Sequence, residues 1–359
     1  MGLSLKWDVT YKCNLFCKHC INASLLSNKV KELETEEVQA IIDKVSSSVK
    51  IDYIHFLGGE PTTRNDLGEI FNYLEKKDID FGFNTNCINF NLNKYGEVLK
   101  NKNLRNIIVS LEGPNSEVND VIRGKNVFNR IIKNLQEIIN FKKENNLKQF
   151  NITVNTVVSK ANYDYIIDMV DFCIDLGVDE LDLLQLIKQG NAESSNDCLT
   201  VEEEVVLVER IAKKYKEVMN KIKITPKFVR PIAKDYCEKV LKLPFPEVFH
   251  TCGAGTNFAF LNNLGYIYPC DRYLYNKIGG QTSEKNNINK KEFFDIWSNE
   301  EFEEAFAATE SKEYETNMVP CNKCKYFKNK CYPCYLTMNL NNKREVKDCS
   351  RFFELIENN

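Results

Sequence analysis

Residues 1–222 alternate between two hydrophobic patterns. Short apolar runs of the strand type are each followed by a longer stretch in which apolar residues recur every three or four positions, as on one face of a helix. In the first of these stretches, Val38, Ile41, Ile42 and Val45 share a face. Strands that alternate with helices in this way predict a parallel sheet with helices outside it.

The pattern predicts six strand–helix units. The strands are expected at Ser4–Val9, Tyr53–Leu57, Ile79–Asn84, Leu104–Leu111, Gln149–Val158 and Glu180–Ile187. The helices are expected at Thr35–Ser48, Asp66–Lys76, Leu92–Lys100, Val127–Glu144, Asp164–Leu176 and Val201–Lys221. A complete TIM barrel needs eight units. We therefore expect an α/β fold with a partial (β/α)6 TIM-like barrel that binds its ligands at the C-terminal ends of the strands.

The pattern changes after residue 222. Four prolines interrupt residues 223–246, which we expect to be a linker. Residues 247–359 are rich in cysteine and have short elements, with one helix expected near Phe293–Thr309. The predicted organisation is a barrel domain (1–222), a linker (223–246) and a cysteine-rich, cluster-binding C-terminal domain (247–359).

Composition narrows the class of protein. The chain has 359 residues, 43% of them hydrophobic, and a formal net charge of -3. This balance is ordinary for a globular protein and does not suggest a nucleic-acid partner. We find no apolar run long enough to cross a bilayer and no signal peptide, so a cytoplasmic location without membrane contact is expected.

Fourteen cysteines are many for such a chain. Three lie between residues 13 and 20 and seven lie beyond residue 250. In a reducing compartment this clustering favours metal ligation over disulfides.

The first cysteine cluster is Cys13, Cys17 and Cys20, a C-x3-C-x2-C run directly after the first strand. Three thiolates can bind three irons of a [4Fe–4S] cube and leave one iron open. The alternative is a zinc site, which needs four ligands and could take His19 as the fourth only in a cramped arrangement. The segment Gly58-Gly59-Glu60-Pro61 follows the second strand. Its glycines let the backbone approach a ligand closely.

Together, these two motifs resemble the radical S-adenosylmethionine (SAM) superfamily. The resemblance implies that the open iron binds the amino and carboxylate groups of SAM and that Gly58–Pro61 bind its amine. It also implies that the cluster reduces SAM and releases a 5′-deoxyadenosyl radical, which abstracts a hydrogen atom. Further contacts with SAM are expected, on weaker matches, from His19, Ser110, Arg123, Asn155 and either Leu184 or Gln185. For Arg123 the alternative is a solvated arginine at a helix start.

The distal cysteines resemble a SPASM domain, which carries two auxiliary [4Fe–4S] clusters. By that resemblance, Cys321, Cys324, Cys331 and Cys349 bind the outer cluster, and Cys252, Cys270 and Cys334 bind the inner one, with an open iron. The alternative is two zinc sites of the C-x2-C type. The spacing x2, x6, x2 departs from the family's usual x2, x5, x3, and this affects the assignment of Cys331 and Cys334.

Asp271 follows Cys270 directly and is the candidate catalytic base, since relatives with the same run use this acid to take a proton from the substrate. The alternative is a surface acid paired with Arg272 or Lys277. Cys87, after the third strand, could donate a hydrogen atom or bind a cluster, but a buried structural thiol is the favoured interpretation.

The resemblance implies an oxidoreductase that modifies a peptide or protein, as in the maturation of ribosomally made peptides by thioether or carbon–carbon cross-links. Alternatives are an anaerobic sulfatase-maturing enzyme that makes formylglycine, a radical dehydrogenase of a small molecule, and a non-catalytic electron-transfer module. An external electron donor, flavodoxin or ferredoxin, is expected. Because only twelve residues precede Cys13, leader recognition is expected from a separate protein or another surface.

Overall fold

The structure is a computed structural model of the chain. It describes residues 2–23, 25–26, 31–277, 279–310, 318–332, 334, 336 and 347–359. Within these ranges no helix is both long enough and apolar enough for a bilayer crossing.

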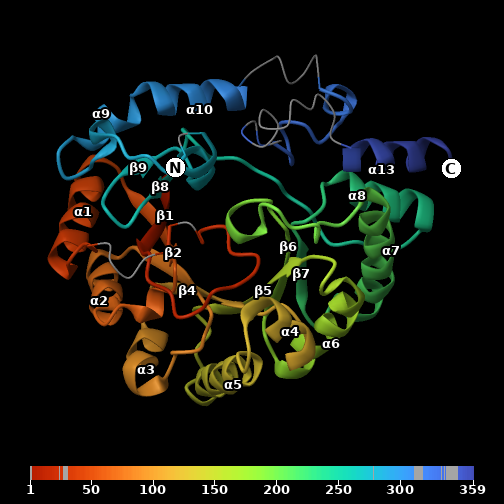
Figure 1. Ribbon diagram of the computed structural model, residues 1–359, viewed down its shortest axis with the longest axis horizontal. Coiled ribbons are helices and arrows are strands. Elements are labelled where there is room, and N and C mark those ends of the chain that lie inside the picture. The colour runs from red at the N-terminus through yellow and green to blue at the C-terminus, as the bar shows by residue number, and fades with distance from the viewer. Residues whose placement is uncertain are drawn as a thin grey trace.

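One curved sheet organises the chain (Figure 1). In sheet order its strands are β7 (Lys223–Pro226), β6 (Glu180–Gln185), β5 (Asn151–Val158), β4 (Leu104–Ser110), β3 (Asp80–Thr85), β2 (Ile51–Gly58), β1 (Leu3–Thr10), β8 (Phe258–Leu261) and β9 (Ile267–Tyr268). All neighbouring strands are parallel except β9, which runs antiparallel to β8. The predicted α/β fold with a partial TIM-like barrel is confirmed.

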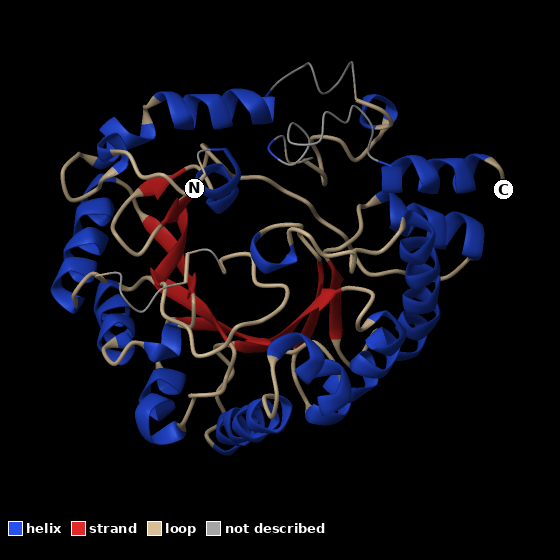
Figure 2. Cartoon of the chain, viewed as in Figure 1, coloured by secondary structure: helices blue, strands red, loops and turns tan. Residues whose placement is uncertain are grey.

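Most of the helices pack on the convex side of the sheet, whereas the last two described helices lie across its open side (Figure 2). The helices are α1 (Thr35–Ser48), α2 (Leu67–Lys77), α3 (Leu92–Lys100), α4 (Ser116–Arg123), α5 (Phe128–Glu144), α6 (Ile166–Leu176), α7 (Val201–Val218), α8 (Ile232–Tyr236), α9 (Phe293–Trp297), α10 (Glu300–Glu310) and α13 (Lys347–Glu357). Helices α1 and α3 have the predicted bounds. Their apolar faces are buried against the sheet, which is the source of most helix stability in proteins.

Three parts of the C-terminal half differ from expectation. Residues 223–226, expected to begin a linker, form β7 at the sheet edge, where Pro226 is tolerated because an edge strand needs fewer donors. The single helix expected near residues 293–309 is two helices, since the Asn299 side chain accepts a hydrogen bond from Glu301 N (2.9 Å) and starts α10 anew. Helix α13 was not expected.

Strand β8 joins the C-terminal domain to the barrel. Its residues pair with β1 from Ser4↔Phe258 to Trp7↔Leu261. One continuous sheet therefore serves both parts of the chain. Tyr275, in the segment that follows β9, lies with its hydroxyl 3.2 Å from that of Tyr11, just before the cysteine loop.

Strand β1 shows how the two faces of the sheet differ. Leu5, Trp7 and Val9 are buried in the apolar core that the helices cover. Because successive strand residues point to opposite faces, Lys6 and Asp8 point to the concave side. The concave side of the barrel is thus partly polar, which is unusual for a buried surface and requires partners for each polar group.

His55 on β2 is one such polar group. Its Nε2 lies 2.7 Å from Asn84 Oδ1, which can only accept, so Nε2 carries the proton. Its Nδ1 then accepts from the Tyr53 hydroxyl at 3.0 Å. Burial lowers the pKa of His55 to about 4, so the imidazole is neutral in the folded protein.

We expect His55 to make stability dependent on pH. Its pKa is about 6.5 when unfolded and about 4 when folded, so the unfolded chain binds more protons between these values. The stabilisation is complete above pH ~6.5 and is lost as pH falls, by roughly 2 kcal/mol down to pH ~5. Anaerobic thermal unfolding across this range should show a shallower pH dependence for His55→Gln; equal slopes would contradict the assignment.

Candidate active site

The loop after β1 carries Cys13, Cys17 and Cys20 at the C-terminal end of the sheet, inside its curve (Figure 1). Backbone contacts from distant segments hold it. Lys18 N donates to Ile122 O (2.9 Å), and the Asn191 side chain donates to Cys17 O (2.8 Å). The three thiols are half-buried. Burial raises the pKa of Cys13 to about 11, so the thiol is protonated until a metal displaces the proton.

Gly58 and Gly59 let β2 pass directly beneath this loop. Gly59 N donates to Thr10 O and Glu60 N donates to Lys12 O, each at 2.8 Å. A Cβ on Gly58 would lie 2.0 Å from Thr10 O, and one on Gly59 would lie 2.1 Å from Lys12 O. Gly58 also has a φ of 125°, which favours glycine. The close approach therefore requires glycine at both positions.

We expect Gly59→Ala to lower both the stability of the protein and its affinity for SAM. The new methyl group cannot fit against Lys12 O unless the cysteine loop moves, so the free energy of unfolding should fall by about 1–3 kcal/mol or more, and SAM binding should weaken. Gly68→Ala in α2 is the matched control, because its Cβ would meet only Val98 Cγ2 at 3.9 Å. Alanine is the better helix former there. Thermal unfolding and SAM titration test this; equal behaviour of the two variants would contradict it.

The Glu60 carboxylate is already hydrogen-bonded to groups of the protein. Its side chain is buried and accepts four hydrogen bonds: from Thr62 N (3.1 Å), Thr62 Oγ1 (2.6 Å), Thr85 Oγ1 (2.7 Å) and Asn86 N (2.6 Å). The carboxylate thereby ties the loop after β2 to the end of β3. Pro61 follows and begins a short 3-10 helix, Pro61–Thr63.

Arg123 ends α4 instead of beginning a helix, and it is 7% exposed, so the alternative of a solvated arginine is wrong. Its guanidinium bonds Glu112 Oε1 at 2.7 Å and also lies 3.9 Å from Cys17 Sγ. His19 Nε2 lies 3.4 Å from the same Glu112 oxygen. Glu112 is a functional candidate that sequence reasoning missed, although an acid directly after a buried strand was a visible signal.

A pocket opens beside this cluster of charges, with about 580 Å³ of empty space. Its lining includes His19, Val157 and Leu186. Burial lowers the pKa of His19, so its imidazole is neutral and offers a flat apolar face. Of the expected β6 contacts, Leu184 is half-buried and Gln185 is exposed, while the next residue, Leu186, lines the pocket.

Ser110 and Asn155 are register neighbours on β4 and β5. Within the described part of the chain, Asn155 Oδ1 is buried without a hydrogen-bond partner, as is His19 Nδ1. A buried polar atom without a partner costs free energy. These two atoms at the C-terminal end of the sheet are therefore suited to a polar ligand such as the nucleoside part of SAM.

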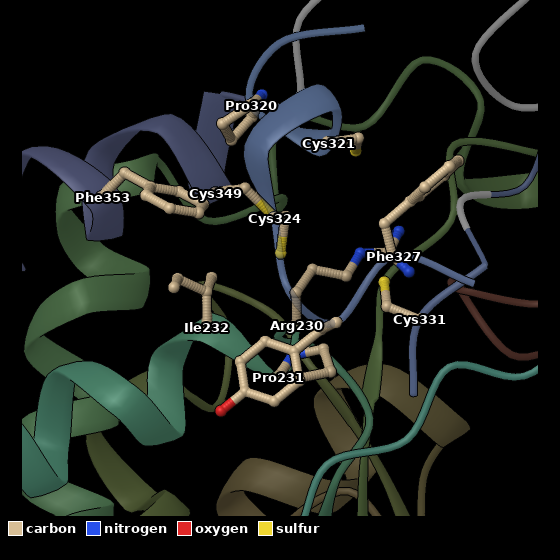
Figure 3. Close-up of a pocket in the computed structure, with 11 residues that line it drawn as sticks. Arg230, Pro231, Ile232, Pro320, Cys321, Cys324, Phe327, Cys331, Cys349 and Phe353 are labelled. Atoms are coloured by element: carbon tan, nitrogen blue, oxygen red, sulfur yellow. The ribbon is translucent and has the colours of Figure 1, made fainter. Parts of the chain in front are cut away.

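The distal cysteines also come together. Cys321, Cys324, Cys331 and Cys349 surround a cavity with about 290 Å³ of empty space (Figure 3). These are the four residues assigned by resemblance to the outer cluster, including Cys331 despite its unusual spacing. Cys252, Cys270 and Cys334 form a second group. Burial, then the charge of Asp271, and then the neighbouring Cys334 and Cys252 raise the pKa of the Cys270 thiol.

The thiol sets fit iron–sulfur clusters in donor type. Within the described ranges, no three His, Cys, Asp or Glu side chains converge closely enough to hold a metal ion. A cube-shaped cluster offers a separate iron to each thiolate, so its ligands need not converge on one point. Cys87, in contrast, is fully buried in the apolar core.

Asp271 is placed by an ion pair to the barrel. Its Oδ2 lies 2.7 Å from Lys6 Nζ on the concave face of β1. Burial opposes ionisation of Asp271, but the Lys6 ammonium outweighs it and holds the pKa of the carboxyl below its usual value. Next to this pair, the Tyr275 hydroxyl donates to Asp8 Oδ2 at 2.6 Å. Lys6, Asp8 and Tyr275 were not anticipated from the sequence.

Comparison with known proteins gives two family matches. Residues 7–173 match the radical SAM superfamily, and residues 252–325 match an iron–sulfur cluster-binding domain called SPASM. Among curated relatives, an AdoMet-dependent heme synthase of Methanosarcina barkeri is 28% identical over 83% of this chain and 82% of its own length. The mycofactocin maturase MftC of Mycolicibacterium smegmatis is 25% identical over 83% of this chain and 71% of its own length.

Solved structures share the fold. SuiB of Streptococcus suis bound to S-adenosylmethionine has a TM-score of 0.72 and 19% identity over 97% of this chain and 77% of its own. The structure of anSMEcpe with bound AdoMet has a TM-score of 0.71 and 17% identity over 99% of this chain and 92% of its own.

Proposed function

We propose that this chain, which belongs to the radical SAM superfamily and carries a SPASM domain, modifies a peptide by abstracting a hydrogen atom from it. The observation that carries the proposal is the position of Asp271. Asp271 follows Cys270, and its side chain pairs with Lys6 on the concave face of β1. The end of the same strand carries the cysteine loop. A base is thereby held between the SAM-binding end of the barrel and the auxiliary cysteines.

In this proposal Cys13, Cys17 and Cys20 hold the SAM-binding [4Fe–4S] cluster. When bound, that cluster supplies the electron that cleaves SAM and generates the radical. Because the Glu60 carboxylate already accepts four hydrogen bonds, the backbone of Gly58–Pro61 receives the SAM amine, and Glu60 positions that backbone. The partnerless Asn155 Oδ1 and the neighbouring Ser110 receive the ribose. His19 and Leu186 flank the adenine, Gln185 lies at its edge, and Arg123 balances charge near Cys17 and the SAM carboxylate.

The chain's own residues would govern the fate of the substrate. Asp271 is ionised at neutral pH, because Lys6 lowers its pKa, so it can accept a proton. Cys252, Cys270 and Cys334 would hold an inner auxiliary cluster, and Cys321, Cys324, Cys331 and Cys349 would hold an outer one. When bound, these clusters would supply the acceptor for the electron that the substrate loses together with this proton. Substrate oxidation by one hydrogen atom, one electron and one proton is thereby balanced.

Names of relatives support a peptide substrate. Besides mycofactocin maturase, a PqqA peptide cyclase is 25% identical over 52% of this chain. SuiB, which shares the fold, is also known bound to its precursor peptide SuiA. The modification that we propose is a thioether or carbon–carbon cross-link in the peptide. We further propose a cytoplasmic location, flavodoxin or ferredoxin as the electron donor, and a separate protein for leader recognition.

Heme synthesis is the second candidate, because the M. barkeri heme synthase is 28% identical over most of this chain. Charge on the concave face favours the peptide. A heme precursor bears several carboxylates. Three of the described cations, Lys6, Lys227 and Arg123, are already paired with Asp271, Asp182 and Glu112 at 2.5–2.7 Å and so are not free to bind them. Formylglycine formation would use the same Asp271 and is also peptide modification.

An anaerobic assay separates these candidates. The reconstituted enzyme with SAM and dithionite is given a short precursor peptide encoded beside its gene, a cysteine-containing sulfatase peptide, or a tetrapyrrole precursor of heme. We expect a peptide to lose two hydrogens in mass as 5′-deoxyadenosine forms. Asp271→Asn should still cleave SAM but yield little product, whereas Asp43→Asn, paired with Lys77 on the outer surface, should behave as wild type. Turnover of only the tetrapyrrole would contradict the proposal.

A further inference from the structure

The cavity of the outer auxiliary site has one basic residue in its described lining, Arg230 (Figure 3). Besides the four cysteines, the rest of that lining is proline, isoleucine and aromatic side chains. Arg230 lies between β7 and α8, in the stretch first expected to be a linker. A fixed charge in such apolar surroundings acts more strongly than one in water.

Hydrogen bonds fix the position of this guanidinium. It donates to His250 Nδ1 at 2.8 Å. Because guanidinium has no acceptor, His250 carries its proton on Nε2, which donates to Val229 O at 2.7 Å. The His250 backbone in turn pairs with the residues on either side of Cys331, through bonds of 2.9 and 2.6 Å. Arg230 is thereby tied to a strand-like segment that carries a cluster ligand.

Two acids face Arg230. Asp348 precedes Cys349, and Glu204 comes from α7. Burial, followed by repulsion from Asp348, raises the pKa of Glu204 to about 8, so Glu204 is mostly neutral at pH 7. The Arg230 guanidinium keeps its charge even where it is buried, because arginine is not deprotonated in proteins.

We propose that Arg230 raises the reduction potential of the outer auxiliary cluster. Four thiolates and the cube together are negatively charged, and reduction by one electron adds another negative charge. A fixed positive charge beside the cluster stabilises the reduced state more than the oxidised state. Net charge and hydrogen bonding around the cluster are established means of setting its potential. The inference rests on the proposed ligand set Cys321, Cys324, Cys331 and Cys349.

In this proposal Arg230 acts on electron transfer only indirectly, through the reduction potential of the outer cluster. With a raised potential, the outer cluster accepts an electron from the inner cluster more readily than it would with cysteine ligation alone. The electron that leaves the substrate would thus be drawn away from the reaction site, while its proton goes to Asp271.

A redox titration monitored by electron paramagnetic resonance tests this. The full chain is used with Cys13, Cys17 and Cys20 replaced by alanine, so that only auxiliary clusters contribute. The outer signal is the one that the double replacement Cys321→Ala/Cys324→Ala removes, because it leaves only two of the four proposed ligands. In Arg230→Met we expect the reduction equilibrium of that signal to fall at least tenfold, a shift of about 59 mV to lower potential for a one-electron couple. Arg230→Lys keeps the positive charge, so its potential should stay close to that of the unsubstituted arginine.

Lys325→Met is the matched control. Lys325 follows the ligand Cys324, but its side chain is 59% exposed and pairs with Asp235 at 2.8 Å. Solvent screens its charge, so its loss should leave the potential unchanged. An unshifted potential in Arg230→Met, or an equal shift in Lys325→Met, would overturn the role of Arg230. If both auxiliary signals survive Cys321→Ala/Cys324→Ala with normal iron content, the ligand set itself is overturned.

Discussion

Cys17→Ala is expected to abolish 5′-deoxyadenosine formation down to the level without enzyme. Cys17 is the middle one of the three proposed ligands in the loop after β1, and its thiol lies 3.9 Å from the buried Arg123 guanidinium. With two ligands left, the cluster loses its anchor and SAM has no open iron to bind. The measurement is anaerobic product analysis with SAM and dithionite, together with iron content.

The auxiliary clusters should survive this substitution, since their cysteines lie beyond residue 250. Iron content should therefore fall by one cluster and not to zero. Cys198→Ala is the control, because Cys198 is half-buried like Cys17 but belongs to neither group of proposed ligands. Undiminished SAM cleavage by Cys17→Ala would place the radical chemistry elsewhere.

Arg123→Met is expected to destabilise the protein by about 3–5 kcal/mol. Arg123 and Glu112 form an ion pair in which the side chains are 7% and 1% exposed. Removal of one partner leaves an uncompensated buried charge. Glu112 also accepts a hydrogen bond from Val157 N at 2.7 Å, so the disturbance reaches the SAM pocket. Anaerobic thermal unfolding should show the loss, and SAM affinity should fall with it.

The double variant Arg123→Met/Glu112→Gln separates the effect of an uncompensated buried charge from the effect of losing Arg123 beside the pocket. It removes the orphaned charge, so it should recover part of the lost stability while SAM binding stays weak. Lys214→Met, which breaks an ion pair with Asp171 whose acid is 52% exposed, should cost at most about 1 kcal/mol. If Arg123→Met lowered the free energy of unfolding no more than Lys214→Met does, the prediction that breaking the buried Arg123–Glu112 pair is costly would be wrong.

Periodicity predicted the barrel well because its strands and helices bury one face each. Helix α1 matched at both ends, since its four apolar positions recur at helical spacing. Strand β7 was missed because it has four residues and ends in a proline. The pairing of β8 with β1 joins residues about 250 positions apart, and no local pattern specifies such a contact.

The site was predictable where two motifs together resemble a known family. Cys13, Cys17 and Cys20 and the segment Gly58–Pro61 could be located in this way, and the structure brings them together. Glu112 and Arg230 gain their importance from what folds against them. Lys6 and Asp8 could have been flagged, because charged residues alternate there with the apolar residues of a buried strand.

The most direct test is reductive cleavage of SAM by the wild-type protein. The chain is purified and reconstituted with iron and sulfide under anaerobic conditions, incubated with SAM and dithionite, and assayed for 5′-deoxyadenosine. We expect the product to form, to require dithionite and to increase when a peptide substrate is present. Intact clusters with no 5′-deoxyadenosine would contradict the assignment of radical SAM chemistry to this chain.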